Sequence, residues 1–121
     1  MARDLGRHDL LVTVGQMDGL PVIRASGELD LSNVSEVRAV VAEQCELRPA
    51  ALIFDLSDLL YMDSSGLGVL VGAKRRLAAH DGEVMIVTEQ NAVLKALQLS
   101  GLDRIIRVFP DVETLRLQRT R

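Results

Sequence analysis

The sequence predicts an α/β fold, a single domain in which a mixed sheet of about four to five strands packs against about four helices. β-rich runs at residues 11–14 and 22–25 flank a turn at residues 18–19, which predicts an N-terminal hairpin. Continuous apolar runs at residues 50–54 and 84–87 are typical of strands covered on both faces. Helical segments lie between these runs, so right-handed crossovers would make the later strands parallel.

The first helix is expected to start near Ser32 or Asn33. Asn33 and Glu36 have the spacing of a capping box, and apolar residues follow at helical spacing. Pro49 is expected to end this helix. Cys45 falls on the apolar stripe, so we expect it to be a small core residue rather than a reactive thiol.

Three further helices are expected, at about residues 65–80, at about residues 90–100 and from about residue 111 onward. Thr88 is predicted as the N-cap of the helix at residues 90–100, and Gly101 as its C-terminal stop. A short strand is predicted at residues 105–109. In the last helix, Val112 and Leu115 are expected to face inward.

The length of 121 residues suits one domain, which we expect at residues 10–117 between an N-terminal arm (1–9) and a C-terminal tail (118–121). The arm has no apolar run of signal-peptide length. No stretch of the chain approaches the ~20 apolar residues of a membrane span. We therefore expect a cytoplasmic protein that makes no membrane contact.

Composition argues against several classes of function. The chain has 14 basic and 17 acidic residues and a net charge of −3, whereas a nucleic-acid binder needs a basic face to neutralise phosphates. One cysteine and two histidines are a thin supply for a metal site or a catalytic triad. We therefore expect no nucleic acid, no metal and no cofactor.

The most informative segment is residues 55–68, which joins a buried strand to a helix at the sheet edge where partners and ligands prefer to bind. Ser64 and Ser65 follow Asp63 at the start of that helix. A serine there can cap the helix, or it can be a phosphorylation site, because free N–H groups and the helix dipole stabilise a phosphate. A phosphate would add about −1.5 to −2 charges and deepen an acidic patch with Asp63, Glu28 and Asp30.

Glycines at positions 66, 68 and 72 of this helix each cost about 1 kcal/mol relative to alanine. Two interpretations, which are compatible, explain why this helix contains three glycines. The helix can pack closely on the sheet, or it can present a smooth face on which the backbone of another protein approaches the serine.

Residues 62–70, MDSSGLGVL, resemble the signature of the STAS domain, specifically that of bacterial anti-sigma factor antagonists. A second match lies at residues 26–30, SGELD, which are similar to the end of that family's second strand. A softer match lies at residues 100–104, SGLDR. The resemblance covers about residues 10–117 and agrees with the expected order of elements.

The resemblance implies a partner-switching mechanism in transcription regulation, of the kind that serves stress responses and sporulation. Unphosphorylated members bind an anti-sigma factor that is also a serine kinase, and they thereby displace the sigma factor. The kinase uses its ATP to phosphorylate the second serine of the motif, here Ser65, and the product no longer binds. A metal-dependent serine phosphatase resets the switch.

The resemblance also implies which residues contact the kinase, and the free chain is expected to be a monomer. The implied partner-binding residues are Glu28, Asp30, Asp63, Ser64, Gly66, Leu67 and Gly68. An alternative is a STAS domain that serves as a scaffold or a small-ligand sensor in another signalling assembly.

An enzyme with Ser64 or Ser65 as nucleophile is the third hypothesis, and the sequence argues against it. Such a serine needs a general base. His8 lies in the arm, and His80 lies roughly 20 Å from Ser65 along the expected helix. The nucleophile-elbow pattern Gly-x-Ser-x-Gly is also absent from the sequence.

Overall fold

A computed structural model describes residues 9–119 of the chain. In chain order its strands and helices are β1 (Leu10–Met17), β2 (Leu20–Leu29), α1 (Val34–Glu46), β3 (Ala51–Asp55), β4 (Leu59–Met62), α2 (Ser64–Ala78), β5 (Glu83–Val87), α3 (Asn91–Ser100), β6 (Arg107–Phe109) and α4 (Val112–Arg119). A short 3₁₀ helix, Leu102–Arg104, precedes β6. The predicted hairpin and the alternation of helices and strands after it are confirmed.

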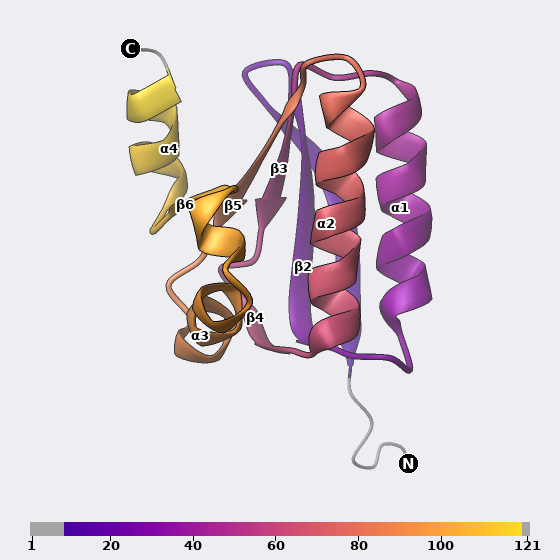
Figure 1. The fold of residues 1–121 in the computed structure, drawn as a ribbon, viewed down its shortest axis with the longest axis vertical. Helices are drawn as coiled ribbons and strands as arrows, with labels where there is room; N and C mark the ends of the chain where they lie inside the picture. Colours follow the sequence, from indigo (N-terminus) through magenta and orange to yellow (C-terminus); the bar gives the residue numbers. More distant parts are fainter. Residues whose placement is uncertain (1–8, 120–121) are drawn as a thin grey trace.

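The strands form one mixed sheet in the order β1-β2-β3-β5-β6 (Figure 1). β1 is antiparallel to β2, and the other pairs are parallel, as predicted. The hairpin turns at Asp18 and Gly19, whose φ angles of 52° and 82° match the two left-handed positions of a type I′ turn. That turn fixes the register in which Met17 pairs with Leu20.

β4 is a strand that sequence reasoning missed, so the sheet has six strands rather than four to five. It pairs with β2 at Gly27–Leu29, whereas β3 pairs with β2 at Val22–Arg24. The register shifts at Gly27, where φ is 101° and an added Cβ would overlap the carbonyl oxygen of Asp9. β4 has only four residues, and their burial follows neither a continuous nor an alternating pattern, so no period marks it in the sequence.

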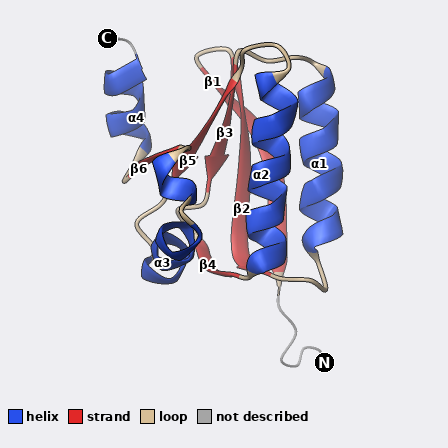
Figure 2. Cartoon of the chain, viewed as in Figure 1, coloured by secondary structure: helices blue, strands red, loops and turns tan. Residues whose placement is uncertain are grey.

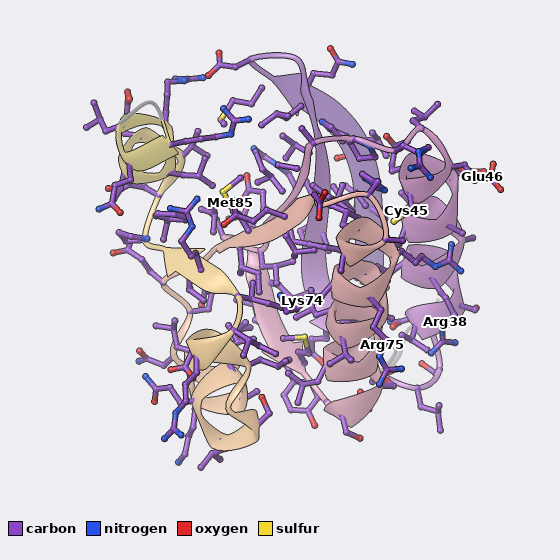
Figure 3. The ribbon with its side chains drawn as sticks, turned by 45° about the horizontal axis from the view of Figure 1, so that its top comes forward. Arg38, Cys45, Glu46, Lys74, Arg75 and Met85 are labelled. Atoms are coloured by element: carbon purple, nitrogen blue, oxygen red, sulfur yellow. The ribbon has the colours of Figure 1, made fainter. Side chains whose placement is uncertain are left out.

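The sheet, drawn red in Figure 2, separates two cores. α1 and α2 cover one face, where Leu52 and Phe54 of β3 join the larger core. Ile53 of β3 points to the other face and packs in a smaller core that includes Leu115 of α4. Met85 of β5 belongs to the same smaller core (Figure 3). Side chains alternate across β3 and all are buried, which explains the continuous apolar run in the sequence.

The predicted capping box of α1 is wrong. Asn33 is the N-cap residue, but its side chain makes no hydrogen bond to the helix. Asn33 Oδ1 instead accepts from the amide of Asp30 at 3.0 Å, and Asn33 Nδ2 donates to the carbonyl of Glu28 at 2.9 Å. The buried asparagine therefore braces the end of β2, and α1 ends at Glu46, ahead of Pro49.

Cys45 is a core residue, as predicted, on the buried side of α1 (Figure 3). Burial raises the pKa of its thiol, and the positive charge of Arg76 opposes that rise only in part. The thiol therefore stays protonated at neutral pH and is a poor nucleophile.

The predicted Thr88 cap of α3 is also wrong, because Gln90 is the N-cap residue. Thr88 is buried, and its hydroxyl donates to the carbonyl of Leu56 while accepting from the amide of Gln90. The predicted stop at Gly101 is confirmed by its left-handed backbone, with φ 78°.

The C-terminal part is close to the prediction. The strand expected at residues 105–109 is shorter, because the 3₁₀ helix and a turn occupy the residues before Arg107. α4 continues to Arg119 and buries Leu115 completely, while Val112 is half-buried. Most of the predicted arm, residues 1–8, and the last two residues of the tail lie outside the described residues. Within residues 9–119, no helix combines the length and apolarity that crossing a membrane requires.

Candidate functional site

The candidate site lies where α2 begins, and its central residue is Asp63. Asp63 is the N-cap of α2, with extended backbone, and its Oδ1 accepts a hydrogen bond from the amide of Ser65 at 2.9 Å. The Ser65 hydroxyl donates to the same carboxylate oxygen. The interpretation in which a serine caps the helix is therefore wrong: the acid caps it, and Ser64 and Ser65 are its first two residues.

The Asp63 carboxylate is held in its ionised form. Burial alone would raise its pKa, but hydrogen bonds from the Ser65 hydroxyl and from the amides of Ser65, Gly66 and Leu31 outweigh burial and lower the pKa below its ordinary value. The carboxylate is thus an acceptor at neutral pH, and it orients the Ser65 hydroxyl.

Asp63 also joins two segments that are far apart in the sequence. Its Oδ2 accepts from the amide of Leu31 at 3.2 Å, and its own amide donates to the carbonyl of Leu29 at 3.2 Å. Asp30 follows β2 and accepts from both the amide and the hydroxyl of Ser32, at 2.9 and 2.6 Å. The loop after β2 and the start of α2 therefore form one surface, at the lower end of the molecule in Figure 1.

The predicted partner-binding residues do not all share this surface. Ser64 and Gly68 are exposed, and Asp63, Ser65 and Leu67 are half-buried. Glu28 lies elsewhere: it alternates with Leu29, which points into the larger core, so its side chain lies on the opposite face of β2, beside Tyr61 of β4.

The glycines of α2 divide between the two interpretations. Gly66 is buried, and an added Cβ would lie 2.5 Å from Cγ of Met62 and 3.0 Å from Cδ2 of Leu29, so it permits close packing. An added Cβ at Gly68 or Gly72 would meet nothing within 4 Å. These two glycines instead form part of a groove of about 140 Å³ between α1 and α2, which Arg38 and Arg76 also line.

Sequence reasoning missed Leu31. Its side chain is 78% exposed, and its amide hydrogen bond to Asp63 holds it beside the start of α2. A leucine within a polar turn, directly after Asp30, was the available signal. We call the surface formed by Asp30, Leu31, Asp63, Ser64 and Ser65 the Ser65 face.

The described residues offer the Ser65 hydroxyl little catalytic support. His80 lies beyond the opposite end of α2, where its Nε2 is 2.7 Å from the carbonyl oxygen of Pro49. Residues 9–119 contain no group of three or more His, Cys, Asp or Glu side chains that could hold a metal ion. The arrangement is a helix N-terminus with an exposed Ser64 and a half-buried Ser65 whose hydroxyl is oriented, which suits a residue that is modified by another protein.

A family model for the STAS domain matches residues 12–115. The chain belongs to the STAS-domain family. A curated relative, the anti-sigma F factor antagonist of Paenibacillus polymyxa, is 33% identical over 92 residues, which cover 75% of this chain and 79% of the relative. The resemblance at residues 62–70 is therefore confirmed at the level of the family.

Solved structures of anti-sigma factor antagonists have the same fold. The antagonist from Mycobacterium paratuberculosis superposes with a TM-score of 0.82 at 25% identity, covering 88% of this chain and 90% of that one. SpoIIAA in its unphosphorylated form gives a TM-score of 0.77 at 27% identity, covering 92% and 98%. SpoIIAA from Bacillus in its phosphorylated form gives 0.69 at the same identity, covering 92% and 100%.

Proposed function

We propose that this chain is an anti-sigma factor antagonist that is switched by phosphorylation of Ser65. In this proposal the unphosphorylated form binds an anti-sigma factor serine kinase and releases the sigma factor, and a metal-dependent serine phosphatase restores that form. The observation that carries the proposal is the Ser65 hydroxyl, which Asp63 orients at the N-terminus of α2. The names of the relatives, and the existence of SpoIIAA in both phosphorylation states, support it.

The geometry suits phosphoryl transfer from ATP bound by the kinase. The Ser65 oxygen would attack the γ-phosphorus, the bond from that phosphorus to the ADP oxygen would break, and the hydroxyl proton would leave toward a carboxylate. Asp63 already accepts a hydrogen bond from that hydroxyl, so the oxygen does not need to be reoriented first. The chain supplies the acceptor, and the kinase supplies the nucleotide.

The phosphate would change the surface while leaving the fold intact. Phosphoserine has no hydroxyl proton, so the hydrogen bond that the Ser65 hydroxyl donates to Asp63 Oδ1 is lost. The phosphate and the Asp63 carboxylate, both negative, then face each other. The dipole of α2 favours negative charge at this end of the helix, so it would stabilise the phosphate where it stands. Since Asp63 also holds the amide of Leu31, we expect the repulsion to reach the loop after β2.

The first experiment locates the modified residue. Incubation with the cognate kinase and ATP should add one phosphate, which mass spectrometry should place on Ser65. Ser65→Ala should remove the modification, while Ser64→Ala and Ser57→Ala should retain it. A phosphate found only on Ser57 or Ser64 would contradict the proposal.

The second experiment tests whether Leu31 is an apolar anchor for the kinase. Burying an exposed leucine contributes about 1.5–3 kcal/mol, so Leu31→Ala should weaken kinase binding by about tenfold or more in calorimetry. Leu99→Ala is the matched control, because Leu99 on α3 is 79% exposed, against 78% for Leu31. Equal losses in the two variants would show that the Ser65 face is not the contact.

A further inference from the structure

We propose that the outer edge of β1 pairs with β1 of a second copy of the chain, so that two sheets join antiparallel about a two-fold axis at Thr13. β1 is the first strand in the sheet order, and no strand among the described residues pairs with its outer side. An open edge is a template for a further strand. The inference is independent of the proposed function.

The backbone groups that point outward can be assigned. In a two-residue hairpin the residues flanking the turn form a hydrogen-bonded pair, here Met17 and Leu20, and such pairs alternate along the strands. The hydrogen bond from the amide of Glu28 to the carbonyl of Asp9, at 3.1 Å, fits the same alternation. The outward N–H and C=O groups therefore belong to the even-numbered residues of the strand, Leu10, Val12, Val14 and Gln16.

The side chains of β1 do not protect this edge. Natural edge strands commonly carry lysines, prolines or bulges that oppose pairing with another chain. The eight residues of β1, LLVTVGQM, include no charged residue and no proline, and their pairing with β2 is regular throughout. Leu11 is 64% exposed and Val14 is 47% exposed. The strand thus presents backbone groups and apolar side chains together.

The strand is complementary to itself in one register. Antiparallel pairing centred on Thr13 places Val12 opposite Val14 of the second copy, and each such pair exchanges two backbone hydrogen bonds. On the other face, the large exposed Leu11 lies opposite Gly15, where an added Cβ would meet nothing within 4 Å. Thr13 meets Thr13 at the axis, a favourable cross-strand pair. The outward N–H and C=O groups of the even-numbered residues then all have hydrogen-bond partners on the second copy, and the contact is self-complementary, as two-fold symmetry requires.

The size and position of this contact predict a weak dimer that leaves the Ser65 face open. One strand per copy is a small interface, at or below the ~1,200 Å² at the low end of specific complexes. We therefore expect a monomer at low concentration and a dimer as concentration rises. Thr13 pairs with Arg24 of β2, away from the β2 residues that pair with β4 next to the site.

Sedimentation of the full chain from about 10 µM to about 1 mM tests the proposal, because that range brackets weak association. The average mass should rise toward twice that of one chain. Val14→Lys should weaken dimerisation at least tenfold, since it places a charge opposite Val12 of the partner copy. Leu99→Lys, an exposed leucine on α3, is the control and should dimerise like the parent.

Amide hydrogen exchange gives a second measurement that does not depend on a variant. Protection of the even-numbered amides of β1 should increase with concentration, while the amides of Leu11, Thr13 and Gly15 should be protected at every concentration. A chain that stays monomeric at about 1 mM would overturn the proposal. So would a dimer in which the even-numbered amides exchange freely, or one that Val14→Lys leaves unchanged while circular dichroism shows the variant folded.

Discussion

The ends of β3 and β4 carry the same local motif in different surroundings. At both ends an aspartate Oδ1 accepts the amide and the hydroxyl of the serine two residues later, in Asp55–Ser57 and in Asp63–Ser65. Asp55 is buried, and its Oδ2 pairs with Arg24 at 2.8 Å. Asp63 is half-buried, and no cation of the described residues pairs with it.

We infer from this difference that the surroundings of a motif decide its role. The turn after β3 is held by other protein groups, because the Ser57 carbonyl accepts a hydrogen bond from the side chain of Gln90 at 2.8 Å. The turn after β4 leads directly into α2, whose dipole favours an added negative charge at this end. The first motif supports the fold, and the second fits the switch proposed for Ser65.

The largest expected difference between the two motifs concerns kinase binding. Ser65→Asp should weaken kinase binding about a hundredfold in calorimetry, about 2.7 kcal/mol, while Ser65→Ala still binds. Ser57→Asp should bind like the parent once folded, but it should lower the free energy of unfolding, because it places a second carboxylate beside buried Asp55. Circular dichroism should show an unchanged helix signal for Ser65→Asp. Equal kinase affinities of Ser65→Asp and the parent would contradict the proposed difference between the two motifs.

The next difference concerns stability. Asp55→Ala removes an ion pair and two hydrogen bonds from a buried carboxylate, so it should lower the free energy of unfolding by about 2–3 kcal/mol. Asp63→Ala removes an N-cap and should cost about 1 kcal/mol. Urea denaturation of both variants measures the two losses. A larger loss of stability in Asp63→Ala than in Asp55→Ala would contradict the proposed difference between the two motifs.

The smallest expected effect is the pH dependence of the Asp63 contribution. Because folding lowers the pKa of Asp63 from its ordinary value of 3.8, the carboxylate stabilises the fold above that value, and the contribution is lost as pH falls through the folded pKa. The stability difference between the parent and Asp63→Ala should therefore be full at pH 7 and shrink in acid. Urea titrations at several pH values measure it, and a difference that grows toward acid would contradict the assignment.

Much of the site could be predicted from the sequence because its parts are local. Asp63, Ser64 and Ser65 are consecutive, and the helix that follows them was recognisable from its period. The capping box of Asn33 and the Thr88 cap are wrong predictions, because each side chain has another partner: Asn33 donates to the carbonyl of Glu28, and Thr88 donates to that of Leu56. Spacing alone does not reveal such partners.

The sequence by itself determined the α/β class, the hairpin, the buried parallel strands and the serine pair at a helix start, since each depends on periodicity or on neighbouring residues. Only the tertiary structure decided that Asp63 caps α2 and holds the amide of Leu31, and that Glu28 faces away from α2. It also decided that β4 completes the sheet and that β1 forms an open edge. The physical reason is that strand pairing and long-range hydrogen bonds join residues whose separation in the chain carries no periodic signal.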